Sequence, residues 1–179
     1  MYLPPWLRLI TLSGLLLVSA CAKAPTSDIK TQAAADDTVK FSGFKTYGWF
    51  AGVGLVKDDT GKWDNGSFDI AAELKFQIDK TLRERGLTES SANPDLLIGF
   101  LIAADVNQLR EISDRGGKVT SVEGVGQSAL WIELLDARTK RTVWVGAAAG
   151  EAKTGRSDDE LKERLSYAVN ELFEGLPRD

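Results

Sequence analysis

The chain has 179 residues, a formal net charge of −4, one cysteine and no histidine. Without histidine it lacks the usual general base, the commonest metal ligand and every histidine-dependent catalytic triad. The mildly acidic balance, with no basic block, argues against nucleic acid as a partner and against electrostatic adhesion to anionic lipid, because both need clustered Lys and Arg.

Residues 1–20 are typical of a bacterial signal peptide. Leu9 to Val18 is a mostly apolar stretch of about ten residues, well short of the roughly 20 that a membrane-spanning helix needs. Arg8 is the only cationic side chain ahead of it. The run Leu17 to Cys21 (LVSAC) resembles a lipobox, in which the cysteine thiol receives a diacylglycerol and becomes the new amino terminus after cleavage. We therefore expect lipidation at Cys21; the alternative is an ordinary secretory peptide with an unrelated cysteine.

Lipidation at Cys21 would predict where the protein resides. Each buried acyl CH₂ contributes about 0.8 kcal/mol, so three acyl chains would hold the protein firmly in the bilayer. Ala22 follows the cysteine, and by resemblance to the sorting rule of enteric bacteria this favours the periplasmic face of the outer membrane. Residues 21–40 are small, polar and charged, which predicts a lipidated flexible tether. A short capping helix over residues 32–37 is the alternative for part of it.

Residues 41–179 are predicted to form a single α+β domain. Its first strand is Phe44 to Phe50, followed by a Gly- and Asp-rich loop over residues 51–66. Ser67 is placed to cap a helix with apolar residues at helical spacing, and Gly86 is placed to end it. The continuously apolar Leu96 to Ala104 predicts a central strand, parallel to the first.

The second half predicts a hairpin and a second helix. Ala129 to Leu135 and Thr142 to Ala148 flank a polar turn, which predicts two antiparallel strands. Ser157 to Glu160 forms a capping box ahead of an amphipathic helix, which Gly175 and Pro177 would end. The expected fold is a two-layer α+β sandwich: a four-stranded mixed sheet, built from a strand–helix–strand crossover and a hairpin, with two helices mainly on one face.

Several short motifs can be compared with known families. They are Phe44-x-x-Tyr47-x-Trp49, Leu82-x-x-x-Gly86, Pro94-Asp95-Leu96-Leu97 and Leu135-Asp136-Ala137-x-Thr139-x-x-x-Val143-Trp144-x-Gly146. Together they resemble a bacterial lipoprotein family with domain of unknown function 4136, over about residues 41–178. The resemblance implies an anchor and a fold, but no reaction and no catalytic residues. Members commonly carry a Tyr- and Trp-rich stretch before the hairpin, whereas here residues 106–127 are dominated by charge and glycine.

No motif predicts catalysis, a metal or a cofactor. With Cys21 consumed by lipid, no thiol remains, and the Ser and Lys positions form no S-x-x-K motif. Asp58 to Gly66 superficially resembles a calcium loop, but it lacks the alternating ligands and the terminal Glu, and Lys62 lies among the carboxylates. Gly52-Val53-Gly54 lacks the third glycine of a dinucleotide fingerprint.

Trp131 and Glu133 are the candidate partner-binding residues. Trp131 alternates along its strand with Leu130, Ile132 and Leu134, and so points to the opposite face together with Glu133. If the helices cover the leucine face, the tryptophan is free to join a binding surface, where aromatic residues are enriched. Ordinary packing within the sheet is the alternative.

The sequence favours a non-enzymatic outer-membrane lipoprotein that presents a periplasmic domain to an envelope protein or ligand. An enzyme or enzyme subunit acting on envelope material is the first alternative, and a homo-oligomeric structural component of the envelope is the second. The sequence does not specify the ligand, the partner or the oligomeric state.

Overall fold

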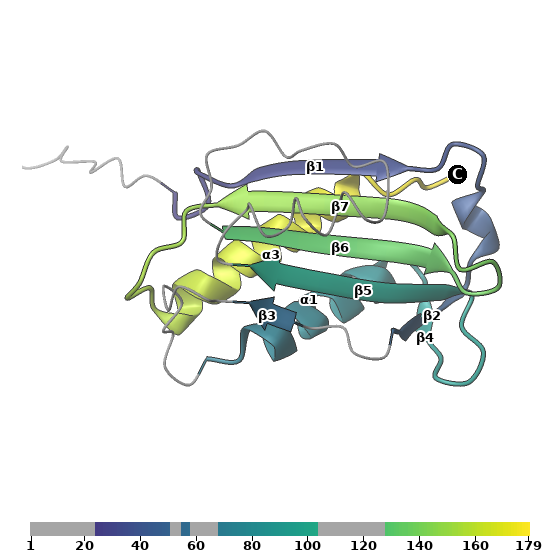
Figure 1. Cartoon of the computed structure of the whole chain (residues 1–179), viewed down its shortest axis with the longest axis horizontal. Coiled ribbons are helices and arrows are strands. Elements are labelled where there is room, and N and C mark those ends of the chain that lie inside the picture. The colour runs from purple at the N-terminus through teal and green to yellow at the C-terminus, as the bar shows by residue number, and fades with distance from the viewer. Residues whose placement is uncertain (1–23, 51–54, 58–67, 104–127) are drawn as a thin grey trace, which may run out of the picture.

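A computed structural model describes residues 24–50, 55–57, 68–103 and 128–179. These residues form an α+β fold in which two helices lie against one face of a mixed sheet (Figure 1). The helices are α1 (Ile70–Glu84) and α3 (Asp158–Glu174), and a short 3₁₀ turn spans Phe41–Gly43. The strands are β1 (Lys30–Ala35), β2 (Thr46–Trp49), β3 (Leu55–Lys57), β4 (Thr88–Glu89), β5 (Leu96–Ala103), β6 (Ser128–Asp136) and β7 (Thr142–Gly150).

The described strands form one seven-stranded sheet in the order β1-β7-β6-β5-β2-β4, and β3 pairs with β5 beside this path. β2 and β3 pair with successive halves of the same edge of β5, both in parallel. β6 pairs antiparallel with β5 on one side and with β7 on the other. The predicted central strand, its parallel partner and the hairpin are therefore confirmed.

The sheet is larger than the four strands predicted, because three short strands lacked a strong pattern. β1 occupies part of the predicted tether and pairs antiparallel with β7 along its whole length, so neither a flexible tether nor a capping helix describes residues 30–35. Its sequence, KTQAAA, has no alternation of large apolar residues. β3 lies within the predicted loop 51–66, and β4 has only two residues.

Both predicted helices are present, with one different cap. Asp69 caps α1, because its side chain accepts a hydrogen bond from the backbone N–H of Ala72, so the cap is not Ser67. Gly86 has φ +85°, the left-handed conformation expected for the residue that ends the helix. Ser157 caps α3 as predicted, with its hydroxyl accepting from the N–H of Glu160.

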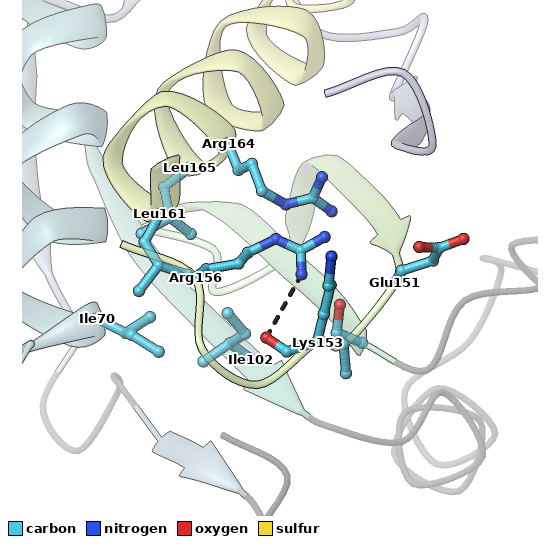
Figure 2. Close-up of a pocket in the computed structure, with 10 residues that line it drawn as sticks. Ile70, Ile102, Glu151, Lys153, Arg156, Leu161, Arg164 and Leu165 are labelled. Carbon is cyan, nitrogen blue, oxygen red and sulfur yellow. Dashed lines mark hydrogen bonds between the residues drawn. The ribbon is translucent and has the colours of Figure 1, made fainter. Parts of the chain in front are cut away.

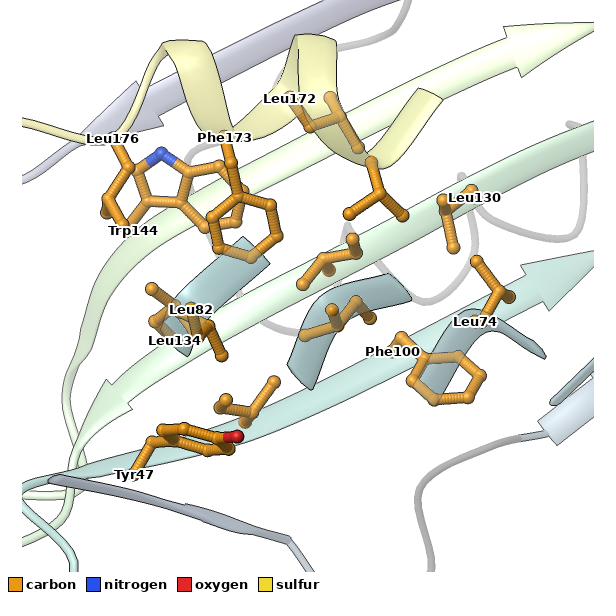
Figure 3. Packing of buried hydrophobic residues seen from close by; sticks show 14 of the residues in the cluster. Tyr47, Leu74, Leu82, Phe100, Leu130, Leu134, Trp144, Leu172, Phe173 and Leu176 are labelled. Carbon is orange, nitrogen blue, oxygen red and sulfur yellow. The ribbon is translucent and has the colours of Figure 1, made fainter. Parts of the chain in front are cut away.

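The core lies between the helices and the inner face of the sheet (Figure 3). Leu74, Ile132 and Leu172 are completely buried there, one each from α1, β6 and α3. At one end of the core the Trp144 ring stacks on Phe173 with centroids 5.0 Å apart, and its indole N–H donates to the carbonyl of Gly175. Helices and sheet therefore share one continuous apolar layer.

Candidate functional site

The predicted lipidation residue, Cys21, lies outside the described residues. The calcium-like loop, residues 58–66, and the glycine pair at residues 52–54 also lie outside them. Trp131 and Glu133 are described, and they sit on β6 as the strand alternation predicts.

Trp131 lies on the face of the sheet turned away from the helices. Leu130, Ile132 and Leu134 belong to the core under the helices, whereas Trp131 packs with Leu101 against the buried side chains of Ala103 and Ala129. Leu101 and Ala103 come from β5, and Ala129 and Trp131 come from β6, near the end of the sheet where Ala103 pairs with Ala129. Trp131 keeps part of its surface exposed, as does Glu133, whose carboxylate accepts a hydrogen bond from the Thr142 hydroxyl.

As predicted, no described helix covers this face of the sheet. Even so, little of the face is exposed. Val145 and Ala147 pair with Glu133 and Trp131 across the β6–β7 ladder, yet they are 7% and 2% exposed. The accessible part of the face is therefore a narrow surface around Trp131 and Glu133. The two predicted residues lie side by side on it, and the Thr142 hydroxyl is hydrogen-bonded to Glu133 there.

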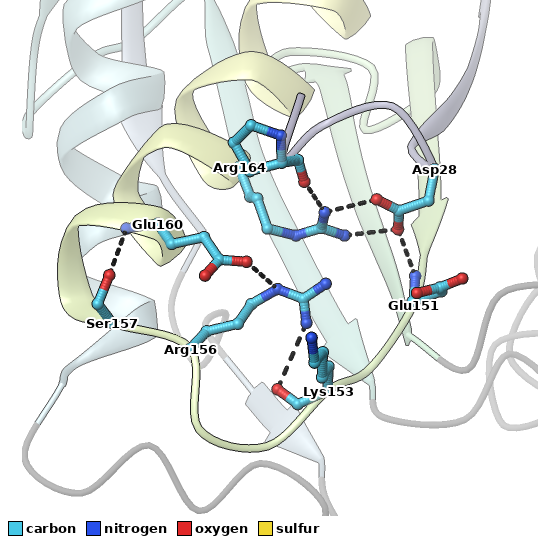
Figure 4. A network of polar contacts seen from close by, with 8 residues as sticks. Asp28, Glu151, Lys153, Arg156, Ser157, Glu160 and Arg164 are labelled. Atoms are coloured by element: carbon cyan, nitrogen blue, oxygen red, sulfur yellow. Dashed lines mark hydrogen bonds and ion pairs between the residues drawn. The ribbon is translucent and has the colours of Figure 1, made fainter. Parts of the chain in front are cut away.

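Sequence reasoning missed a buried ion pair between the start of the domain and α3. The Arg164 guanidinium holds both carboxylate oxygens of Asp28, at 2.6 and 2.8 Å, and also donates to the carbonyl of Pro25 (Figure 4). The N–H of Glu151, just after β7, donates to the same carboxylate at 2.7 Å. These hydrogen bonds, led by those from Arg164, hold the pKa of Asp28 well below its usual range.

A second arginine lies beside this pair, where the chain enters α3. Arg156 has only 7% of its side chain exposed, and its Nε lies 2.9 Å from a carboxylate oxygen of Glu160. This contact is an ion pair whose geometry does not make a hydrogen bond at Nε. The guanidinium also donates to the backbone carbonyl of Lys153. Two arginines and their two carboxylates thus form a joint, which we call the Arg164 joint: Asp28, Arg156, Glu160 and Arg164.

A cavity of about 80 Å³ lies against this joint (Figure 2). Its lining combines apolar side chains such as Ile102 and Leu165 with Lys153, Arg156 and Arg164. Pockets for drug-sized ligands measure roughly 300 to 1,000 Å³, so this one holds only a few water molecules. Its arginines face carboxylates, and the hydroxyl of Ser128 donates to the Gly150 carbonyl. The arginines of the lining are thus engaged with carboxylates, and its serine with a backbone carbonyl.

A polar cluster on the opposite flank of the sheet explains one of the sequence motifs. Asp79, buried on α1, accepts hydrogen bonds from the Tyr47 hydroxyl at 2.9 Å and the Trp49 indole at 3.1 Å. Lys75 pairs with the same carboxylate at 2.8 Å and lies over the Trp49 ring. Burial, followed by the contact with Asp79, raises the pKa of the Tyr47 hydroxyl. The cluster joins β2 to α1.

The described residues contain no group of three or more His, Cys, Asp or Glu side chains placed to hold a metal ion. In the same part of the chain, neither helix is long and apolar enough to cross a bilayer. The fold and its polar clusters thus define a small α+β domain with one helical layer, in which the two arginines beside the cavity pair with carboxylates.

A family described as domain of unknown function (DUF4136) matches residues 31–178. The chain therefore belongs to the DUF4136 family, as its motifs suggested. The matched range starts within β1, which agrees with that strand being part of the domain. No curated protein matches the chain.

Several solved structures are similar to this chain, and the first named here supports the fold. A DUF4136 family protein from Bacteroides thetaiotaomicron is similar with a TM-score of 0.59 and 15% identity, covering 82% of this chain and 95% of that one. A PelC dodecamer from Paraburkholderia phytofirmans matches with a TM-score of 0.45 and 12% identity, covering 81% of this chain and 94% of that one. A PDZ domain protein from Parabacteroides distasonis has a TM-score of 0.46 and 18% identity, covering 85% of this chain and 36% of that one.

Proposed function

We propose that this protein is a non-enzymatic lipoprotein, anchored through Cys21 at the periplasmic face of the outer membrane, whose domain binds an envelope partner. The observation that carries the proposal is the run Leu17 to Cys21, placed directly ahead of a folded domain. Ala22 after the cysteine supports the outer membrane. A binding role rather than a catalytic one is supported by the pairing of both arginines beside the described cavity with carboxylates.

The anchor is tested by Cys21→Ser. This variant should incorporate no labelled fatty acid and should accumulate as precursor or as protein free of the membrane fraction. The matched control is Ser19→Ala, which keeps a small residue ahead of the cleavage site and should still be lipidated. Continued incorporation of fatty acid into Cys21→Ser would contradict the proposal.

The proposed partner surface is the exposed part of Trp131 together with Glu133. The tryptophan offers a large apolar area beside a carboxylate, on the face that the helices leave free. Truncation to alanine should weaken partner binding while costing little folding stability, because Trp131 is already partly exposed.

The test compares Trp131→Ala with Phe76→Ala, which removes an aromatic side chain that is 59% exposed on α1. Each lipidated variant is crosslinked in the native envelope and purified, and its unfolding is measured in urea. Trp131→Ala should lose a crosslinked partner that the wild type and Phe76→Ala both retain. Identical crosslinked partners in all three proteins would contradict the proposed surface, and severe unfolding of Trp131→Ala with unchanged partners in its folded fraction would place Trp131 in the core.

A further inference from the structure

The short stretch of chain between Cys21 and Pro25 determines which part of the domain lies nearest the proposed anchor. Pro25, whose carbonyl accepts a hydrogen bond from Arg164, follows Cys21 by only four residues. A fully extended chain spans at most about 3.6 Å per residue, so four residues reach no more than about 14 Å. If Cys21 is lipidated, Pro25, which contacts the Arg164 joint, must therefore lie within about 14 Å of the acylated residue.

The joint also restricts how the domain can turn about that point. Asp28 is held by both nitrogens of the Arg164 fork and by the N–H of Glu151, and Arg164 is 8% exposed. Two residues after Asp28 the chain enters β1, which runs antiparallel to β7 from Lys30 to Ala35. The segment that follows the anchor is thus tied to both α3 and the sheet, and cannot act as a long swivel.

We propose that the end of the domain carrying the Arg164 joint rests on the bilayer that holds the lipid anchor, so that the β6–β7 turn points into the periplasm. The inference rests on the proposed lipidation of Cys21. The end of β7 at Gly150 and the start of α3 lie at the Arg164 joint, whereas the turn of residues 137–141 lies at the other end of β7 (Figure 1). Nine residues of strand at about 3.3 Å each separate the two ends by roughly 27 to 30 Å.

The proposed contact is with the lipid surface and does not depend on charge attraction. Lys153 and Arg156 lie at this end, but Asp158, Asp159 and Glu160 begin α3 there as well. The acyl chains supply the binding energy, and the short connection supplies the orientation. Trp131 lies three residues into β6 from the same end, so a partner bound there would also be close to the membrane.

The orientation can be measured with two labelled positions at opposite ends of the domain. Lys153 and Arg138 are both exposed cations, one beside the Arg164 joint and one in the β6–β7 turn. In full-length lipidated protein the Cys21 thiol is blocked, so Lys153→Cys or Arg138→Cys provides a single thiol for a fluorophore. Each protein is placed in vesicles of phosphatidylethanolamine and phosphatidylglycerol that carry a nitroxide quencher on the headgroup.

We expect quenching at position 153 to exceed quenching at position 138 several-fold. A control with ten Gly and Ser residues inserted between Lys23 and Ala24 should reduce this difference, because the domain is then free to tumble. Equal or reversed quenching in a protein that floats with the vesicles and carries acyl mass on Cys21 would overturn the orientation alone. A protein without acyl mass that fails to float would overturn the proposed anchor, and the orientation with it.

Discussion

Replacing Asp28 with asparagine should destabilise the domain more than its position in the predicted tether suggests. The substitution keeps the shape of the side chain but removes the charge that faces Arg164, whose side chain is only 9% exposed. Removing one partner of a buried ion pair leaves the other charge uncompensated, which typically costs about 3 to 5 kcal/mol. The asparagine oxygen and the Pro25 carbonyl still accept hydrogen bonds from Arg164, so we expect the lower end, about 3 kcal/mol.

A cost of about 3 kcal/mol is a large part of the roughly 5 to 15 kcal/mol that stabilises a typical domain, and should lower Tm by about 6 to 12 °C. Urea unfolding followed by tryptophan fluorescence measures it. The control is Arg141→Gln, because Arg141 pairs with Asp36 at 3.4 Å but is 75% exposed, so its loss should cost less than about 1 kcal/mol. A loss below about 1 kcal/mol for Asp28→Asn would show that the N-terminal segment contributes little to folding.

Three further outcomes are expected. Because the pKa of Asp28 is lower in the folded than in the unfolded state, its contribution is complete above about pH 4 and is lost as pH falls further, so acid titration should destabilise the wild type more than Asp28→Asn. Leu74→Ala, at a completely buried position, should cost about 2 to 5 kcal/mol in urea unfolding, whereas Phe76→Ala should cost under about 1 kcal/mol. A chain beginning at Asp37 lacks β1 and the Asp28 pair, and should unfold at markedly lower urea than one beginning at Ala24; equal midpoints would restore the tether interpretation.

The elements with strong periodicity were predictable from the sequence. α1 and α3 carry apolar residues at helical spacing, and β5 is a continuous apolar run, so local patterns were enough to assign them. β1 was missed because its stability comes from pairing with β7 and from the Asp28–Arg164 contact, which joins residues 136 positions apart. A short polar and alanine-rich segment gives no local signal for such a contact.

The Arg164 joint was not predicted from the sequence either. Its four residues come from the N-terminal segment, the β7–α3 connection and α3. In the sequence alone, each is indistinguishable from an ordinary charged surface residue. One signal was available: Arg164 follows Leu161 by three residues and precedes Ala168 by four, which places it on the buried face of α3. A charge on the apolar stripe of a helix needs a partner, and that partner could have been sought.

The motifs that identify the family act in the fold. Tyr47 and Trp49 both donate to Asp79 and so attach β2 to α1. The Asp95 carboxylate accepts from the N–H groups of Lys45 and Thr46, which ties the entry of β5 to the start of β2. These contacts explain why the motif residues occur together without implying any reaction.

The residues of the hairpin motif also make structural contacts. Asp136 accepts from the N–H groups of Arg138 and Thr139 and so shapes the turn. A Cβ on Gly146 would lie 2.6 Å from the Trp144 ring, so glycine leaves the space that the buried indole fills. Because these family motifs form turns, ladders and core, they specify the fold, and our proposal therefore places partner binding on surface residues outside them, Trp131 and Glu133.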